Sequence, residues 1–584
     1  MGGNNYPRGL YQTRPVMHLD LSPVLEGGSI GKFLESSAAE GVLLVDGFLG
    51  IDWEKVKSRI REIAALSSWE VVDMRQALCS EGEVNARIAP YIDNCDPVFG
   101  KLYEGDLEDF FRPEARQALQ RRVSGREVVV CGTGAALADE KRPVVYLDVS
   151  KENLQNRRQT LTNLGQDEPS PKTFYKRAYF VDWPVLERHR HAIRPRISLW
   201  IDSNDENRWL ALTGDDLRHT ISWFARRPFR VKPWFLPGPW GGQFLKGHMG
   251  LDGSQPNYAW SYELIAPENG VLVGNDSAAL ELPFPFIIAQ EPAAYLGGHV
   301  ASTFGCSFPI RFDYLDTIDG GNLSVQCHPS DGFIRSQFGE PFTQDETYYI
   351  HDCEKGSTVF LGFREDADLP EFWRTARASE AGGRPFDVTR FVNVWPSKRH
   401  DMFLIPNGTV HCSGRGNLVL EISATPYIYT FKIYDYVRRD LHGELRPLHI
   451  DYAERNARPE RTTRWVEENL IPAARLKSRG PTWELYELCN SPLLFYGVDR
   501  IDFSTCVSQE TCSGVEVVNL VEGDHIEIVS GLATVTLHYA ETAVIPAATG
   551  EYELLNRSNN RAKLVKAFVK QHDEKLHAPS GGWN

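Results

Sequence analysis

The sequence predicts a multidomain protein in which an N-terminal α/β domain, a doubly wound parallel sheet, precedes two all-β modules joined by a helical insert. Three observations predict this class. The chain has 584 residues, too many for one hydrophobic core. Strand-like and helical segments alternate over about the first 225 residues. Prolines and glycines then crowd into VKPWFLPGPWGGQF, and short strands with turns follow. The predicted ranges are 1–228, 229–440, 441–475 and 476–584.

The N-terminal region repeats a strand, glycine turn and helix. GVLLVDGFLG is an apolar strand with a Gly-rich end, and the helical pattern that follows has Asp52 in the N-cap position. REVVVCGTGAAL repeats the pattern, and so does RPVVYLDVSKENLQNRRQ, where Ser150 is placed to cap the helix. Short Val-rich strands between helices are typical of a parallel sheet covered on both faces. Ligands of such sheets lie at the carboxyl ends of the strands.

The later regions consist mainly of strands. YYIHDCEKGSTVFLGF predicts two strands about a Glu-Lys-Gly turn, and DMFLIPNGTVHCSGRGNLVLEISA predicts two more about Gly-Arg-Gly. DYAERNARPERTTRWVEENL is helical in pattern and forms the insert. From about residue 475 the strand pattern returns, as in VVNLVEGDHIEIVSGLATVTLHY.

Composition excludes several classes of partner. The formal net charge is −15 and no long Lys/Arg run occurs, so we expect no nucleic-acid partner. No apolar run approaches the roughly 20 residues of a membrane helix, and the first residues lack signal-peptide features. The ten cysteines are scattered, without a C-x-x-C pair. We therefore expect reduced thiols and a cytoplasmic protein.

Four residues suggest a metal site. In GNLSVQCHPSD, residues Gln326 and His328 share one face of a strand because side chains alternate. Glu346 begins the next apolar strand, and His411 follows the turn in IPNGTVH. An amide oxygen, two imidazoles and a carboxylate suit a divalent first-row metal, zinc foremost. The alternative is a set of ordinary hydrogen-bonded strand residues, and spacing alone does not decide between them.

Several segments together resemble the type I phosphomannose isomerases. They are GPWGGQFL, NYAWSYEL, FPIRFDYLDTIDGGNLSVQCHPSD, DETYYI, FLIPNGTVHCSGRGNLVLEIS and IYTFKIYDY, in the family's order, within about residues 233–584. The resemblance implies a cupin (double-stranded β-helix) pair, one Zn²⁺ or other divalent metal per chain, and a sugar or sugar phosphate as the small-molecule partner. It also implies the metal ligands Gln326, His328, Glu346 and His411. A homodimer is an open alternative.

The polar residues around those ligands differ from the family pattern. Gln344 stands where the family has a lysine, Lys432 where it has an arginine, and Asp313 where another lysine is expected, with Arg311 nearby. Glutamine cannot shuttle a proton at neutral pH. The hypothetical catalytic groups are therefore Lys432, Glu421 and Asp313. The alternatives are a salt-bridged lysine and a structural carboxylate.

Four residues are expected to bind substrate: Ser324, Arg311, Trp240 and Gln344. Ser324 shares the face of Gln326 and can meet a phosphate oxygen, and Trp240 can stack on a sugar. The alternatives are a strand hydroxyl that is already hydrogen-bonded and an ordinary core tryptophan.

The first 228 residues weakly resemble the uridine-kinase-like branch of the P-loop fold, yet no G-x-x-x-x-G-K-[ST] occurs in the chain. Three functions follow from the whole sequence. The first, which the resemblance to the phosphomannose isomerases implies, is a metal-dependent aldose–ketose isomerase acting on a sugar or sugar phosphate through an enediol, with a substrate other than mannose as an open alternative. The second is a sugar-binding regulatory protein with reduced catalysis. The third, a bifunctional kinase–isomerase, is opposed by the missing lysine loop.

Overall fold

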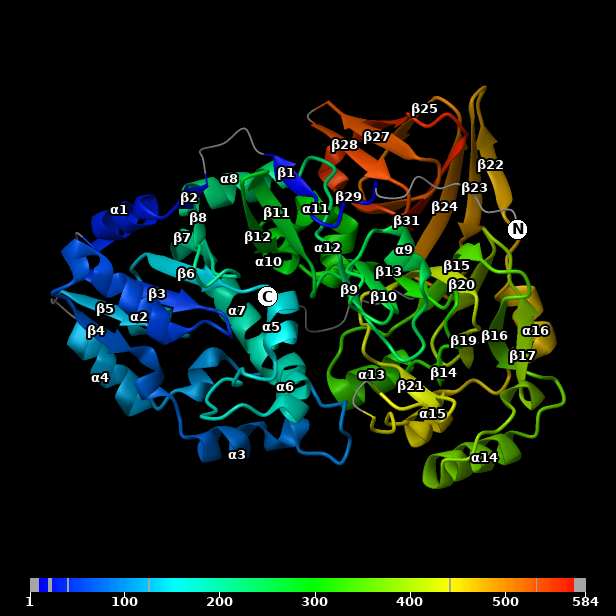
Figure 1. The fold of residues 1–584 in the computed structure, drawn as a ribbon, viewed down its shortest axis with the longest axis horizontal. Coiled ribbons are helices and arrows are strands. Elements are labelled where there is room, and N and C mark those ends of the chain that lie inside the picture. Colours follow the sequence, from blue (N-terminus) through cyan, green and yellow to red (C-terminus); the bar gives the residue numbers. More distant parts are fainter. Residues whose placement is uncertain are drawn as a thin grey trace. The chain divides into compact units, whose positions relative to one another are not determined.

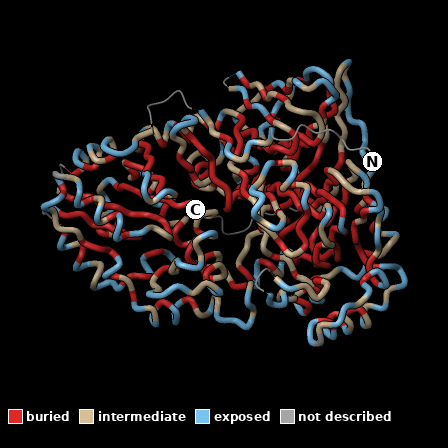
Figure 2. The backbone as a smooth tube through the Cα atoms, in the orientation of Figure 1, coloured by how far each residue is buried: buried red, intermediate tan, exposed pale blue. Residues whose placement is uncertain are grey.

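The computed structural model describes residues 10–18, 24–38, 41–123, 127–440, 443–531 and 533–571. Two compact units divide the chain (Figure 1). One contains Val16–Trp223 and Gly270–Gln290, and the other contains Phe224–Asn269 and Glu291–Asn584 together with the first 15 residues. In each unit the buried residues follow the strands, while exposed residues lie mainly on helices and turns (Figure 2). The prediction of a multidomain, mixed α/β chain with β-rich sheets is confirmed.

The unit around Val16–Trp223 is built on a seven-stranded sheet in the order β2-β8-β7-β6-β3-β5-β4. Its central strands consist of buried apolar residues, as in Val128–Cys131. The five strands from β7 to β4 pair in parallel, whereas β8 and β2 add antiparallel strands at one edge. The bounds are β2 Leu25–Glu26, β3 Val42–Gly47, β4 Glu70–Asp73, β5 Val128–Cys131, β6 Val144–Asp148, β7 Ile197–Asp202 and β8 Leu210–Thr213.

The helices between these strands begin where the sequence predicts caps. Asp52 accepts hydrogen bonds from the backbone N–H groups of Glu54 and Lys55 at the start of α2, and Ser150 accepts one from Asn153 at the start of α5. Both predicted caps are confirmed. The longer helices are α1 Gly28–Ser37, α2 Trp53–Glu62, α3 Glu81–Ile92, α4 Pro113–Val123, α5 Lys151–Arg157, α7 Trp183–Ile193 and α8 Gly214–Phe224.

The other unit contains two pairs of antiparallel sheets, which we call the first and second β modules. In the first module a six-stranded sheet has the order β18-β15-β20-β13-β10-β9, and a five-stranded sheet has the order β17-β16-β19-β14-β21. The bounds are β9 Trp234–Leu236, β10 Trp260–Leu264, β13 Ile310–Asp316, β14 Val325–Cys327, β15 Glu346–Cys353, β16 Thr358–Phe363, β17 Val392–Pro396, β18 Met402–Ile405, β19 His411–Ser413, β20 Asn417–Ala424 and β21 Phe431–Tyr434.

The second module pairs a six-stranded sheet, β22-β23-β24-β31-β26-β29, with a four-stranded sheet, β25-β30-β27-β28. Their inner faces form one apolar core that includes Ile501, Leu520 and Leu564. The bounds are β22 Arg475–Arg479, β23 Trp483–Cys489, β24 Tyr496–Phe503, β25 Cys506–Glu510, β26 Glu516–Glu522, β27 His525–Ser530, β28 Ala533–His538, β29 Thr542–Ile545, β30 Glu551–Asn556 and β31 Ala562–Val569.

Two of the predicted turns connect strands of opposite sheets. The Glu-Lys-Gly turn joins β15 to β16, and the Gly-Arg-Gly turn joins β19 to β20, yet the strands of each pair belong to different sheets. A strand that is buried on one face gains more by pairing within its own sheet than with its sequence neighbour, so these turns become corners between the two layers.

The four domain ranges remain a prediction. The structure adds that β11 Gly270–Asn275 and β12 Ala278–Pro283 pack with the unit around Val16–Trp223, where β11 pairs in parallel with β1 Val16–His18. The predicted helical insert contains α15 Ile450–Asn456 and α16 Thr463–Asn469; residues 441–442 lie outside the described residues. Among the described helices, none has the length and apolar character needed to cross a membrane.

Candidate metal centre

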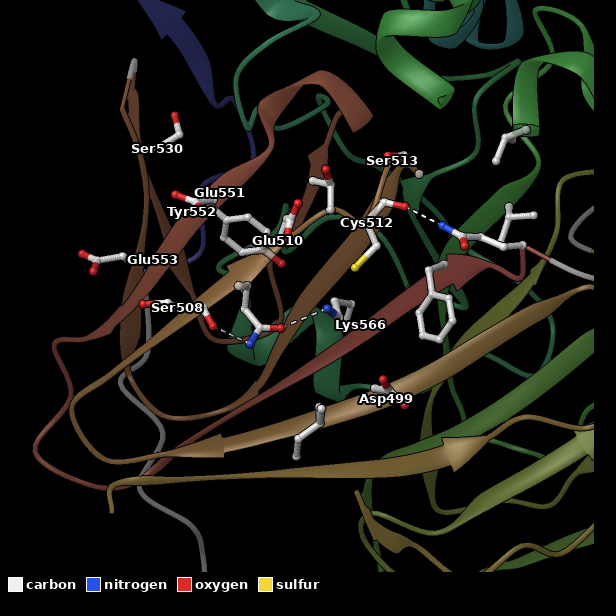
Figure 3. Close-up of a pocket in the computed structure, with 18 of the residues that line it drawn as sticks. Asp499, Ser508, Glu510, Cys512, Ser513, Ser530, Glu551, Tyr552, Glu553 and Lys566 are labelled. Atoms are coloured by element: carbon white, nitrogen blue, oxygen red, sulfur yellow. Dashed lines mark hydrogen bonds between the residues drawn. The ribbon is translucent and has the colours of Figure 1, made fainter. Parts of the chain in front are cut away.

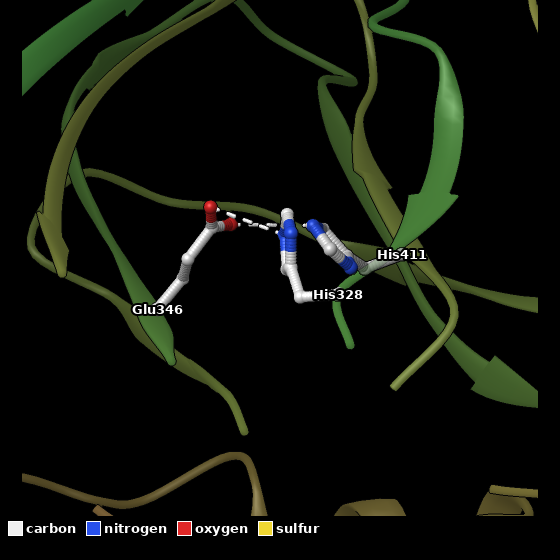
Figure 4. A group of neighbouring side chains, drawn as sticks. All are labelled: His328, Glu346 and His411. Carbon is white, nitrogen blue, oxygen red and sulfur yellow. Dashed lines mark ion pairs between the residues drawn. The ribbon is translucent and has the colours of Figure 1, made fainter. Parts of the chain in front are cut away.

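Three strands bring His328, Glu346 and His411 together (Figure 4). His328 directly follows β14, Glu346 is the first residue of β15, and His411 is the first residue of β19. β14 and β19 pair so that Gln326 lies opposite His411. All three side chains are buried, and their ligand atoms lie within 4.8 Å of one another. The structure thus joins residues that are far apart in the sequence.

Two distances between donor atoms are close to those of a tetrahedral metal site. His328 Nε2 lies 3.1 Å from Glu346 Oε1, and His411 Nε2 lies 3.3 Å from Glu346 Oε2. Ligands at about 2.0–2.1 Å from a tetrahedral zinc ion are about 3.3 Å apart. His328 Nε2 and Glu346 Oε2 are also buried without a hydrogen-bond partner. Buried polar atoms of this kind are normally satisfied, so a shared cation fits the cluster.

Backbone carbonyl groups orient both imidazole rings. His328 Nδ1 lies 3.0 Å from the Tyr429 carbonyl oxygen, and His411 Nδ1 lies 2.9 Å from that of Thr409. A carbonyl can only accept a hydrogen bond, so each Nδ1 carries the proton. Each Nε2 lone pair is therefore directed toward Glu346, which is the usual arrangement for histidine ligands of a metal.

The turn before His411 requires a glycine at position 408. Gly408 has φ of +79°, and a Cβ atom there would lie 2.5 Å from the Asn456 carbonyl oxygen. Its N–H group donates a 2.9 Å hydrogen bond to the His328 carbonyl oxygen. The turn in IPNGTVH thereby ties the strand of one imidazole to the strand of the other, which explains why a glycine stands there.

Gln344 supports two of the three ligands. Its Nε2 donates a 2.6 Å hydrogen bond to Glu346 Oε1, and its Oε1 accepts a 3.0 Å bond from the Tyr429 N–H group. The carbonyl group of Tyr429 in turn orients His328. Gln344 is only 2% exposed. Sequence reasoning placed Gln344 among substrate-binding residues; the structure gives its amide two internal partners, and substrate contact stays a prediction.

Arg311 links three buried carboxylates: Asp313, Glu421 and Glu346. It forms ion pairs with the first two and lies 3.1 Å from Glu346 Oε1. Burial raises the pKa of Asp313 to about 6 against the opposing effect of Arg311, and burial raises the pKa of Glu421 well above its ordinary value. These are environments in which a carboxyl group can take or release a proton near neutral pH.

Glu346 differs from its two neighbours. Burial alone would raise its pKa, but the imidazoles of His328 and His411 lower it well below the ordinary value. Burial lowers the pKa of His411. An ionised carboxylate beside a neutral imidazole is the protonation state that a metal ligand set needs.

The remaining predicted residues lie at different distances from this centre. Gln326 Nε2 lies 3.4 Å from His411 Nε2, and Ser324 Oγ donates a 2.9 Å hydrogen bond to Gln326 Oε1.

Lys432 is half-buried and stands opposite Gln326 in the β14–β21 register, so both side chains leave the same face of the sheet. Trp240 is 2% exposed and packs edge-on against Trp260, as a core residue does. Roles in substrate binding and catalysis stay predictions.

Sequence reasoning missed the carbonyl groups of Tyr429 and Thr409. Every residue carries a carbonyl group, so no sequence signal could have marked these two. The supporting role of Gln344 was also missed, although its position two residues before Glu346 on the same face gave a usable signal.

Comparisons with known proteins match the chain to a family model and to two mannose-6-phosphate isomerases. Residues 28–226 match a family model described as a domain of unknown function, DUF8485. The chain is 26% identical over 329 residues to mannose-6-phosphate isomerase ManA of Bacillus subtilis (strain 168), covering 56% of this chain and 95% of that protein. It is 25% identical over 313 residues to mannose-6-phosphate isomerase of Streptococcus mutans, covering 53% and 88% respectively. The crystal structure of the B. subtilis mannose 6-phosphate isomerase covers 59% of this chain and 99% of its own, with 19% identity and a TM-score of 0.47.

Proposed function

We propose that this protein is a metal-dependent aldose–ketose isomerase acting on a sugar or sugar phosphate. The convergence of His328, Glu346 and His411, with both Nε2 atoms directed at one carboxylate, carries the proposal. The similarity to two mannose-6-phosphate isomerases supports the reaction class. Mannose 6-phosphate is therefore the first substrate to test.

Zinc is the proposed metal because two imidazoles and a carboxylate are a ligand set found in catalytic zinc sites. When bound, the ion would supply a Lewis acid that polarises a sugar carbonyl group. The chain itself holds His328, Glu346 and His411 in place, with Gln326 as the proposed fourth ligand. The cupin assignment for both β modules belongs to this proposal.

The chain must also move a proton between C2 and C1, which defines an enediol route. Lys432 is the best placed of the three candidate groups because it leaves the sheet on the face of Gln326. Glu421 and Asp313 are both held by Arg311, so either must leave that ion pair to reach a sugar. We assign Lys432 as the general acid, or as the positive charge that stabilises negative charge on the substrate. The two carboxyl groups remain alternative bases.

A specific observation favours a second function, a sugar-binding regulatory protein. Gln344 stands where the resemblance expects a proton-transferring lysine, and its amide hydrogen-bonds to Glu346 and to the Tyr429 N–H group. A metal centre held this firmly can bind a sugar without turning it over. Binding and turnover can be separated experimentally.

The test is an assay of ketose formation from aldoses and their 6-phosphates with the zinc-loaded full chain. The proposed function predicts turnover of at least one substrate and loss of turnover in His328→Ala/His411→Ala. A matched variant is Gln344→Lys, which restores the expected lysine; a gain of activity would show that Gln344 limits catalysis. Binding of a sugar by the wild type without turnover of any substrate would contradict the isomerase and favour the regulatory protein.

For the unit around Val16–Trp223 we propose a kinase-like fold that transfers no phosphate and serves in docking or regulation. The glycine turn after β5 begins at Gly132, and its backbone N–H groups are of the kind that bind anions. Here the buried Asp46 carboxylate accepts hydrogen bonds from the N–H groups of Gly134 and Ala136, at 2.8 Å each. His189 lies 2.9 Å from the same carboxylate. An internal carboxylate thus takes the place of a phosphate. A cytoplasmic location and homodimer formation also remain proposals.

A further inference from the structure

The second β module contains a large cavity that the proposed metal centre does not use. Its volume is about 1070 Å³, and its walls come from strands β22 to β25, β27, β30 and β31 together with the start of α12 Gly298–Phe304 (Figure 3). Exposed residues such as Glu510 and Glu553 lie at its edge, so the cavity opens to the surface. This volume is slightly above the roughly 300–1,000 Å³ of typical small-molecule sites, so the cavity has room for such a ligand and water.

The inward-facing residues of the module form an apolar half and a polar half, which follow one another along the strands. On β24 the residues Ile501 and Phe503 join the apolar core, whereas Asp499, on the same face, lines the cavity. On β31, Leu564 joins the core while Lys566 lines the cavity. Asp499 and Lys566 are direct partners in the β24–β31 register. The apolar core already packs the two sheets against one another, and the charged residues of the other half lie outside that core.

Lys566 is held by a buried polar network. It is 7% exposed, and its Nζ donates hydrogen bonds to Glu516 Oε1 at 2.9 Å and to Gln509 Oε1 at 3.0 Å. Tyr552 Oη donates a 2.6 Å bond to Glu516 Oε2. Replacing a buried ion pair by apolar residues is often neutral or stabilising, so packing alone does not require this network.

Asp499 has an unused acceptor. It is 4% exposed, and Lys477 donates a 2.8 Å hydrogen bond to its Oδ2, but its Oδ1 is buried without a partner. A buried carboxylate oxygen left unsatisfied is costly. A hydroxyl group entering the cavity beside Lys566 would supply the missing donor once the carboxylate turns toward it.

We propose that this cavity is a second, non-catalytic binding site for a small neutral polyhydroxylated molecule such as a free sugar. Carboxylates accept from its hydroxyl groups, the Lys566 ammonium donates to its oxygens, and the ring of Phe568 offers an apolar wall. Four carboxylates line the cavity against two ammonium groups: Asp499, Glu510, Glu551 and Glu553 against Lys477 and Lys566. This excess of negative charge disfavours a phosphorylated sugar. The proposal does not depend on isomerase activity.

The test measures binding of methyl glycosides of mannose, glucose and galactose to the full chain by isothermal titration calorimetry. A methyl glycoside has a locked anomeric carbon and cannot be isomerised, so binding is separated from turnover. We expect at least one glycoside to bind both the wild type and His328→Ala/His411→Ala. Asp499→Asn, which keeps the shape and removes the charge, should weaken binding about tenfold or more.

Two further variants make the test specific. Lys566→Met/Glu516→Gln removes both charges of the buried pair and should also weaken binding about tenfold. Asp502→Asn is the matched control, because Asp502 is a buried carboxylate on the same strand that pairs with Arg500 and does not line the cavity; it should leave binding unchanged.

Three results would overturn the proposal. They are the absence of binding by every glycoside, loss of binding in the metal-site variant with retention in Asp499→Asn, and tighter binding of mannose 6-phosphate than of methyl mannoside by His328→Ala/His411→Ala.

Discussion

Replacing Gln344 by leucine should weaken metal binding without removing any ligand. Leucine keeps the approximate size of the side chain but cannot donate to Glu346 or accept from the Tyr429 N–H group. Glu346 Oε1 then keeps only its contact with Arg311 of its two donors, and Tyr429, whose carbonyl group orients His328, is left with an unpaired N–H group. Two of the three ligands lose part of their support.

The size of the effect follows from these contacts. Removing a residue that supports metal ligands typically weakens metal affinity about 10–100-fold, or about 1.4–2.7 kcal/mol. The unpaired Tyr429 N–H group should also lower the free energy of unfolding by about 1–3 kcal/mol. Both effects are expected because Gln344 is buried and water cannot replace the amide.

The assay is competition for Zn²⁺ between the purified chain and a chromophoric chelator, with unfolding by denaturant measured on the same samples. Gln344→Asn is a useful control: it keeps the amide but is one methylene too short to hold both partners, so an intermediate affinity is expected. Zinc affinity equal to that of the wild type in a folded Gln344→Leu variant would refute the supporting role.

Three other predictions follow. Lys432→Met should keep the fold and the metal but lower the rate of isomerisation about a hundredfold, and full activity in a steady-state assay would reduce Lys432 to a salt-bridge partner. The hydrogen bond from His400, together with Lys563, lowers the pKa of Glu522 to about 2, so its stabilisation is complete above about pH 4.5 and is lost as the pH falls toward 2. Glu522→Gln should therefore cost about 1–2 kcal/mol of unfolding free energy at pH 7 and almost nothing at pH 2, and an equal cost at both would contradict this ion pair. The full chain should transfer no phosphate from ATP to sugars or nucleosides, because Asp46 already occupies the backbone N–H groups of the glycine turn; phosphorylated product detected by mass spectrometry would contradict it.

Much of the site could be predicted from the sequence because its signals are local. Alternation placed Gln326 and His328 on one face, and the caps at Asp52 and Ser150 were visible as residue types before a helical pattern. Sheet membership could not be predicted in this way. The Glu-Lys-Gly turn looks like a hairpin, but pairing is decided by long-range burial, which a short window does not contain.

The polar surroundings of the metal centre were equally hard to predict. Gln344 and Lys432 could be recognised as departures from a family pattern, but what each contacts depends on backbone groups such as the Tyr429 peptide. The cavity in the second module had no sequence signal either, since Asp499 and Lys566 are 67 residues apart and meet only through the β24–β31 register.

The metal content of the purified chain tests the central claim most directly. Elemental analysis after dialysis should find one divalent ion per wild-type chain, bound by Gln326, His328, Glu346 and His411. The double variant His328→Ala/His411→Ala should contain almost none, because only the Glu346 carboxylate and the Gln326 amide remain of the four proposed ligands. A full metal complement in the folded double variant would contradict the assignment of this cluster as the metal centre.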